Sequence, residues 1–279
     1  MNVSKISKQQ NPSEQRIALI IQYLGTKYNG WQRQPIGRTI QGEIETAIAS
    51  VLDKPVTIYG AGRTDAGVHA AAQVAHFNYT GPIPSEKWAK IINSRLPEGI
   101  VIRASARVPN NWHACFSANW RRYRYTIYTD KLPNLFVGAI SWHYYHSFLD
   151  EIAIQQALDP LIGRHELSAF RKAGANRKHS WVNVQDAVCY RQNSFLYLEM
   201  QADGFLYGMV RLLVGLLIEV GTGNLSPAEF TNIWQNRQRE RVKYSAPAKG
   251  LSLLRVGYSV FPFSPNIWFD TQPKYILAT

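Results

Sequence analysis

The sequence predicts an α+β protein made of two ferredoxin-like units, each with the element order β-α-β-β-α-β. Three observations favour this fold class. Short stretches of alternating or β-branched residues indicate strands, and stretches with apolar residues at helical spacing indicate helices. The same order of elements occurs twice along the 279 residues, although the halves share no visible sequence identity. We expect the units to join near Pro109 in one extended, mainly antiparallel sheet with helices on one face.

The first unit is predicted over residues 16–109. After Thr39, a residue type that often caps helix N-termini, apolar residues at helical spacing predict a helix over residues 39–52. A second helix is predicted over residues 85–96. Four β-rich stretches complete the unit as strands, at residues 16–23, 56–61, 73–79 and 100–108.

The second unit is predicted over residues 110–262, with a flexible N-terminal tail at residues 1–15 and a C-terminal tail at residues 263–279. The stretch at residues 205–220 is apolar on nearly every face, so we expect a buried helix there. The predicted helices are residues 149–161, 205–220 and 226–236, and the predicted strands are residues 121–128, 184–190, 195–202 and 251–260.

The composition indicates a globular protein with a polyanionic partner. The chain holds 31 Lys and Arg against 19 Asp and Glu, a formal net charge of +12, and its pI is near 9.7. Such an excess favours a phosphate-rich ligand, because each phosphate that Lys or Arg neutralises releases condensed counterions. A basic protein with an ordinary solvated surface is the alternative that charge alone leaves open.

Cysteine content and hydropathy indicate the compartment. Cys115 and Cys189 are too few for a disulfide framework or a thiolate zinc site, which fits a reducing environment. The N-terminus lacks the apolar segment of a signal peptide, and the apolar stretch at residues 212–220 is too short to span a bilayer. We therefore expect a soluble, cytoplasmic protein that does not associate with a membrane.

Residues 60–69, Gly-Ala-Gly-Arg-Thr-Asp-Ala-Gly-Val-His, lie between two predicted strands and carry three glycines. Glycines here permit positive φ and let a ligand approach the backbone. A Walker-type phosphate loop is excluded, because no Gly-Lys-Ser/Thr follows. On local chemistry alone, Asp65 can simply cap a turn. A metal site of Asp65, His69 and His76 is a weaker interpretation, because no helix brings the three together.

Arg211 is independent evidence for a site. It lies in the apolar helix predicted over residues 205–220, and an unpaired buried charge costs several kcal/mol. Arg211 therefore either reaches the surface, pairs with Glu219 or Asp203, or pairs with a functional carboxylate. Asp65 is the best functional candidate, and such a pair would keep Asp65 ionised near neutral pH.

Aromatic and basic residues alternate between residues 112 and 125. In a strand, Tyr123 and Tyr125 share one face while Arg122 and Arg124 share the other. Planar rings stack on splayed bases and arginines contact phosphates, so the segment favours RNA binding. The alternative is a half-buried strand with core tyrosines and a solvated basic face, which we favour for Tyr125.

A second basic cluster lies in a loop with Gly and Ala after residue 170, which has the composition to grip an RNA backbone. Because ferredoxin-like sheets leave one face open, we expect RNA in a broad central cleft between the two units. The candidate RNA-binding residues are His113, Arg121, Arg171 and Lys172.

Five ordered motifs identify a family. The chain resembles the TruA-type tRNA pseudouridine synthases from about Arg16 to Tyr258. The motifs that carry the resemblance are Tyr28-Asn-Gly-Trp31-Gln-Arg-Gln34, Gly62-Arg-Thr-Asp-Ala-Gly-Val-His69, Phe116-Ser-Ala with Arg121-Arg-Tyr-Arg-Tyr125, Met209-Val-Arg211 and Ala246-Pro-Ala-Lys-Gly-Leu251.

The resemblance implies an isomerase that converts uridine to pseudouridine at positions 38 to 40 of the tRNA anticodon arm. It implies Asp65 as the essential carboxylate, Arg63 as the residue linked to base flipping, Tyr123 as a contact to the target base and Arg211 as the partner of Asp65. It also implies a homodimer with tRNA across both subunits and no cofactor, catalytic metal or other protein partner. Whether Asp65 attacks the base or the sugar, or removes the C2′ proton, is not implied.

The sequence departs from the family pattern at Cys115, Gly208 and Val182. The family commonly has Arg at the first position, His or Gln at the second and Arg at the third. Each departure can weaken an RNA contact or shift substrate choice. Two other functions are also compatible with the residues: a non-catalytic RNA-binding protein, and a metal-dependent phosphohydrolase that uses Asp65 and the two histidines.

Overall fold

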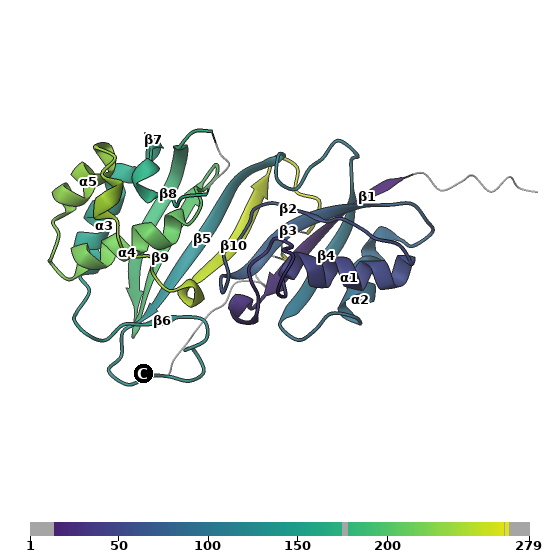
Figure 1. Ribbon diagram of the computed structural model, residues 1–279, viewed down its shortest axis with the longest axis horizontal. Coiled ribbons are helices and arrows are strands. Elements are labelled where there is room, and N and C mark those ends of the chain that lie inside the picture. The colour runs from purple at the N-terminus through teal and green to yellow at the C-terminus, as the bar shows by residue number, and fades with distance from the viewer. Residues whose placement is uncertain (1–13, 175–177, 265, 268–279) are drawn as a thin grey trace, which may run out of the picture.

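The computed structural model describes residues 14–174, 178–264 and 266–267 (Figure 1). The predicted tails, residues 1–15 and 263–279, lie mostly outside these ranges, and the first strand already begins at Gln15. Within the described ranges, no helix is long and apolar enough to cross a membrane.

The first half of the chain has the predicted order of elements. Its strands and helices are β1 (Gln15–Tyr23), α1 (Ile40–Leu52), β2 (Tyr59–Gly60), β3 (His69–Tyr79), α2 (Trp88–Asn93) and β4 (Ile100–Val108). The Thr39 hydroxyl accepts a hydrogen bond from Gly42 N–H, which confirms the predicted N-cap of α1. The strand predicted at residues 100–108 has the same bounds as β4.

The second half repeats the order and adds short elements. It comprises β5 (Ala118–Tyr128), β6 (Trp142–His143), α3 (Glu151–Leu158), β7 (Gly163–Glu166), β8 (Trp181–Gln192), β9 (Phe195–Ala202), α4 (Met209–Gly221), α5 (Pro227–Gln235) and β10 (Leu251–Tyr258). Single 3₁₀ turns lie at Gly25–Lys27, Ser85–Lys87, Asp159–Leu161, Ser168–Phe170, Arg239–Arg241 and Ala248–Gly250. The sequence did not predict β6 or β7.

The ten strands of the described residues belong to one sheet, with the main order β4-β1-β3-β10-β5-β9-β8-β7. Most neighbours are antiparallel, and the two units meet where β3 and β10 pair in parallel, Ser252 with His69 and Leu253 with Ala70. The predicted α+β class with two β-α-β-β-α-β units in one extended sheet is therefore confirmed. In Figure 1, α1 and α2 lie beside one end of the sheet and α3, α4 and α5 beside the other, with β5 and β10 between them.

The strand predicted at residues 56–61 is reduced to the two residues of β2. The cause lies in α1. Ile58 N–H donates to the carboxylate of Glu45, and the Ile58 carbonyl accepts from the Gln41 side chain. Side chains of α1 thus bond to the backbone N–H and carbonyl of Ile58, which would pair with a neighbouring strand if β2 were longer.

Two helices differ from prediction for identifiable reasons. The helix predicted at residues 85–96 is a 3₁₀ turn followed by α2. The helix ends early because Pro97 disfavours helical geometry in the residue before it. The helix predicted at residues 205–220 begins only at Met209. Gly208 precedes it with a φ of +70°, a left-handed conformation that no helix interior contains.

The sheet face that carries the predicted tyrosines is the one that faces the cleft. Tyr123 and Arg211 of α4 line the same cleft, so the cleft lies on the helix side of the sheet. Which face of the sheet binds RNA stays a prediction. On the opposite face, Arg122 is 23% exposed and bonds to the carboxylates of Asp186 and Glu199.

Candidate active site

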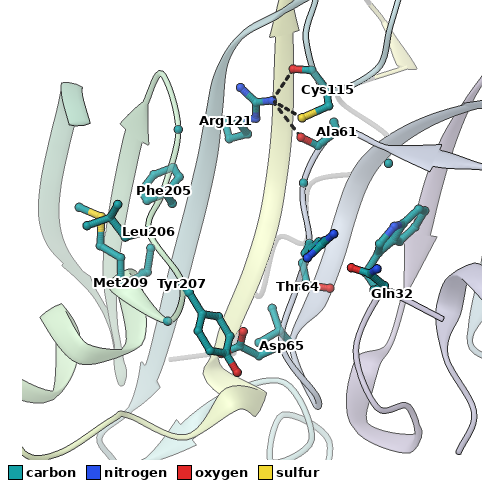
Figure 2. Close-up of a pocket in the computed structure, with 18 of the residues that line it drawn as sticks. Gln32, Ala61, Thr64, Asp65, Cys115, Arg121, Phe205, Leu206, Tyr207 and Met209 are labelled. Carbon is teal, nitrogen blue, oxygen red and sulfur yellow. Dashed lines mark hydrogen bonds between the residues drawn. The ribbon is translucent and has the colours of Figure 1, made fainter. Parts of the chain in front are cut away.

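A cleft of about 1690 Å³ opens between the two units, and loops from both line it (Figure 2). Asp65 contributes from the loop between β2 and β3, where its side chain is 19% exposed. Tyr123 contributes from β5, Phe205 from the loop before α4, and Arg211 from α4 itself. The carboxylate is thus accessible from the cleft and faces residues of the other unit.

The backbone at Asp65 forms a tight turn. Val68 N–H donates to the Asp65 carbonyl at 3.1 Å, and Gly67 has a φ of +79°, which favours glycine at that turn position. The expectation that Asp65 begins a turn is correct for its backbone. Its carboxylate serves a different purpose, because Oδ2 accepts a hydrogen bond from Arg211.

Hydrogen bonds from buried groups stabilise the loop that carries Asp65. The Thr64 hydroxyl lies 2.8 Å from the Tyr23 hydroxyl, and the Gln73 amide donates to the Gly62 carbonyl at 2.8 Å. Trp31 N–H donates to the Thr64 carbonyl at 3.0 Å. These bonds fix the backbone on both sides of Arg63 and hold the loop in one conformation.

Two glycines let the segment around Trp31 pack against this loop. A Cβ at Gly30 would lie 2.5 Å from the Thr64 carbonyl oxygen, and Gly30 has a φ of +87°. A Cβ at Gly60 would lie 2.6 Å from the Trp31 ring. Close packing of the Trp31 segment against this loop therefore explains Gly30 and Gly60, whereas Gly62 has nothing within 4 Å of its Cβ position and faces the cleft.

Arg211 is held at both ends of its guanidinium. Its Nη1 donates to Asp65 Oδ2 at 3.1 Å, and its Nε donates to the Ala246 carbonyl at 2.7 Å. The alternative partners are engaged elsewhere: Glu219 accepts from Asn224, and Asp203 Oδ1 accepts from a backbone N–H. The predicted pair of Arg211 and Asp65 is present, and the buried-charge argument that led to it is correct.

Lys172 also faces this pair. Its Nζ lies 3.9 Å from Asp65 Oδ2, and its side chain is 27% exposed. Burial lowers the pKa of Lys172, Arg211 lowers it further, Asp65 raises it and Arg239 lowers it. The sequence predicts Lys172 as an RNA contact, whereas its position beside the carboxylate depends on the fold.

Tyr123 is a nearly buried wall of the cleft. Its ring meets Phe205 edge to face, with centroids 4.9 Å apart. Burial raises the pKa of Tyr123 to about 12, with Arg121 acting against the shift and Asp65 adding to it. The side chain is therefore a neutral phenol near pH 7, suited to pack on a planar ring and to donate one hydrogen bond.

Arg121 joins three loops at the top of the cleft. Its guanidinium donates to the carbonyl oxygens of Ala61 at 2.9 Å and Cys115 at 2.8 Å (Figure 2). It also donates to the Asp203 carbonyl at 2.8 Å. The RNA contact predicted for Arg121 stays a prediction, but the contacts within the protein already show one role. It ties the Asp65 loop to two segments of the second unit.

A row of rings extends from the cleft at its rim. His113 stacks on Phe116 with centroids 4.3 Å apart, and Phe116 is 85% exposed. His113 also contacts His76, and His76 stacks on Tyr59, which is half exposed. Burial and the charge of Arg16 lower the pKa of His113, so a stacking role suits it better than a charged contact to phosphate.

The remaining predicted residues occupy the cleft without a resolved role. Arg63 is exposed on the Asp65 loop and lines the cleft. Arg171 also lines it, and its Nη1 donates to the Ser180 hydroxyl at 3.3 Å. Both stay predictions as RNA contacts.

The three predicted metal ligands are not arranged as a site. His69 Nδ1 accepts from Gly25 N–H, and its Nε2 bonds to the Lys249 carbonyl. His76 Nδ1 accepts from Ala114 N–H. Among the described residues, no three His, Cys, Asp or Glu side chains gather closely enough to hold a metal.

The three departures from the family pattern have different consequences. Cys115 lines the cleft and supplies a carbonyl to Arg121. Val182 is fully buried in β8, where it packs in the core instead of facing a ligand. Gly208 lies next to the site, with the Lys172 side chain against it.

Comparisons with known proteins agree on one family. A family profile described as tRNA pseudouridine synthase matches residues 19–117 and 157–259. The tRNA pseudouridine synthase A of Rippkaea orientalis is 64% identical over 267 residues, which cover 96% of this chain and 91% of that protein. The protein of the same name from Nostoc sp. is 59% identical over 273 residues, which cover 98% and 97%.

A search of solved structures gives weaker matches. A Cbf5–Nop10–Gar1 complex aligns with 85% of this chain and 57% of that chain at 12% identity, with a TM-score of 0.35. This likeness is too low to support an argument.

Proposed function

This chain belongs to the tRNA pseudouridine synthase family, an assignment that confirms the resemblance seen in its motifs, and we propose that Asp65 starts its reaction on uridines 38, 39 and 40 of the anticodon arm. The chain is an isomerase that converts uridine to pseudouridine in tRNA. The main support for this proposal is the position of the Asp65 carboxylate, which lines the cleft and accepts a hydrogen bond from Arg211 at 3.1 Å.

The chemistry needs a carboxylate beside a flipped nucleotide. A stacked uridine offers its glycosidic bond to no side chain, so the target base has to leave the helix. Arg63 is exposed on the loop that carries Asp65, and in this proposal it fills the space that the base leaves. Tyr123 then packs on the extruded uracil against Phe205.

The isomerisation exchanges one bond to the sugar for another. Asp65 starts the breakage of the bond between C1′ and N1, the freed base rotates, and C5 bonds to C1′. N1 gains a proton and C5 loses one, so no electrons enter or leave and no redox cofactor takes part. The residues of the cleft bind, orient and shield the base during this rotation.

The tRNA lies in the cleft between the units in this proposal. The net charge of +12 favours the phosphate backbone, and His113, Arg121, Arg171 and Lys172 line or border the path. We also propose a cytoplasmic homodimer with tRNA across both subunits. Sedimentation of the free protein and of its tRNA complex tests this assembly.

Asp65→Asn separates catalysis from RNA binding. The amide keeps the shape of the side chain but lacks a carboxylate, so we expect no pseudouridine while tRNA affinity stays within about twofold. Product formed by Asp65→Asn would disprove the catalytic role of Asp65 and leave it a turn residue, with another group starting the reaction.

Two further measurements test the substrate and the metal alternative. Pseudouridine mapping in tRNA from cells with and without the gene should show loss at positions 38 to 40, and loss elsewhere would disprove the proposed positions. Activity should survive exhaustive treatment with EDTA. Loss of activity that a divalent metal restores would disprove the metal-independent reaction.

A further inference from the structure

Two cations approach the same oxygen of Asp65. Arg211 Nη1 lies 3.1 Å from Oδ2, and Lys172 Nζ lies 3.9 Å from the same atom. In the described ranges 14–174, 178–264 and 266–267, no hydrogen bond or ion pair reaches Asp65 Oδ1. The carboxylate is therefore held through one oxygen while the other remains available to a substrate in the cleft.

Gly208 makes room for the lysine. A Cβ at Gly208 would lie 2.5 Å from Cδ and 2.7 Å from Cε of Lys172, so any other residue would occupy part of the space that the lysine fills. Gly208 also has a φ of +70°, which side chains other than glycine rarely adopt. Gly208, which departs from the family pattern, therefore leaves the space that the Lys172 side chain occupies.

The backbone holds Lys172 in this position. Its N–H donates to the Tyr207 carbonyl at 3.0 Å, and the Arg239 guanidinium donates to the neighbouring Arg171 carbonyl at 3.0 Å. The ammonium also lies 5.9 Å from the centre of the Tyr207 ring. A lysine that serves only the RNA backbone extends into solvent, whereas this one is turned inward to a single carboxylate.

We infer that Lys172 is a positioning residue for the Asp65 carboxylate: it fixes Oδ2 together with Arg211, leaves Oδ1 to the substrate, and depends on Gly208 for access. This rests on the proposed function of Asp65. Loss of the lysine lets the carboxylate rotate away from the reactive geometry, and a displacement of this kind slows the chemical step more than it weakens binding.

The first experiment separates chemistry from binding. Single-turnover rates and tRNA Kd values are measured for Lys172→Met, which keeps the apolar stem and removes the charge. We expect the single-turnover rate to fall about tenfold with Kd within about twofold. Lys90→Met, an exposed lysine on α2 outside the cleft, serves as the control and should keep the parent rate. An unchanged rate with a weaker Kd would overturn the inference and make Lys172 a phosphate contact.

The second experiment tests the dependence on Gly208. Gly208→Ala should slow the single-turnover step, and Lys172→Met combined with Gly208→Ala should be no slower than the slower single variant, because both remove one contact. Losses that multiply in the double variant would overturn the link, since they would show that Gly208→Ala acts on α4 and Arg211 instead of on Lys172.

Chemical rescue excludes a merely structural effect. In Lys172→Ala, ethylammonium at tens of millimolar should restore part of the single-turnover rate, whereas tetramethylammonium at the same ionic strength should not. Failure of ethylammonium to restore any rate would count against the charge as the active feature. Asp65→Asn is run beside these variants: activity in Asp65→Asn would disprove the proposed function, whereas parent-like Lys172→Met with inactive Asp65→Asn would disprove only this inference.

Discussion

Arg121 Nη2 lies 2.9 Å from the carbonyl oxygen of Ala61, and this bond ties β5 of the second unit to the loop that carries Asp65. The same guanidinium donates to Cys115 and Asp203, so one planar group sets the spacing of three loops. Lysine has no such fork of donors. Arg121 is therefore a structural element of the cleft, whatever contact it also makes to RNA.

Arg121→Lys should impair catalysis by loosening the Asp65 loop. We expect kcat to fall about 10- to 100-fold, because displacements near 1 Å at a reactive group have effects of that size. Steady-state kinetics and thermal melting provide the measurement. A change confined to the tRNA Kd, with kcat and Tm unchanged, would show that Arg121 acts mainly on RNA.

Arg211→Met should remove the hydrogen-bond donor of Asp65 and lower kcat about 100-fold or more, the usual cost of losing one charged donor at a reacting group. It should also lower the free energy of unfolding by about 1 to 3 kcal/mol, because the partly buried carboxylate loses its partner.

Urea unfolding of the double variant checks the cause of this instability. Adding Asp65→Asn to Arg211→Met removes the carboxylate that has lost its hydrogen-bond donor, so the double variant should be more stable than Arg211→Met alone. Equal or lower stability of the double variant would show that Arg211 stabilises the fold through Ala246 and not through Asp65.

Phe116→Ala should weaken tRNA binding without harming the fold. The ring is 85% exposed and stacked on His113, so it is available to one base, and stacking of a base on a ring contributes about 1 to 3 kcal/mol. Filter binding should give a Kd raised roughly 5- to 100-fold at an unchanged Tm. Phe148→Ala removes another exposed ring, outside the cleft lining, and should bind as the parent does.

His76 should make stability depend on pH. Burial, with His113 and Arg16 adding to it, lowers the pKa of His76 from 6.5 to about 3 in the folded state. The unfolded chain therefore binds a proton that the folded chain does not, and stability falls as pH drops below about 6.5. The loss reaches about 2 kcal/mol at pH 5 for this group alone.

His76→Asn should flatten this dependence between pH 7 and pH 5 in urea unfolding, although His69 and His113, whose pKa values burial also lowers, keep part of it. His146→Asn, an exposed histidine, is the control and should keep the parent slope. The same slope in both variants would show that the pH dependence originates at other groups.

Several elements were predictable because one physical pattern determines each of them. The bounds of β4 and β9 follow from β-rich runs between clear breaks, and the start of α1 follows from the Thr39 cap. The pairing of Arg211 with Asp65 followed from charge and hydropathy, since a cation in an apolar helix needs a carboxylate.

Other features depend on contacts between distant segments, which periodicity does not record. The shortness of β2 results from Glu45 bonding to Ile58, and the late start of α4 from the left-handed Gly208. The contact of Lys172 with Asp65 joins residues more than a hundred positions apart. Gly208 was the one sign of this contact in the sequence. The structure shows that its lack of a side chain leaves room for Lys172.

The parallel pairing of β3 with β10 has a consequence for biosynthesis. β10 is the last strand of the described chain, yet it lies in the middle of the sheet, between the strands that carry the Asp65 loop and Tyr123. A nascent chain on the ribosome can form the first three-stranded unit early, but it cannot close the cleft until translation has passed Tyr258. Assembly of the cleft therefore depends on β10, the last strand of the described chain.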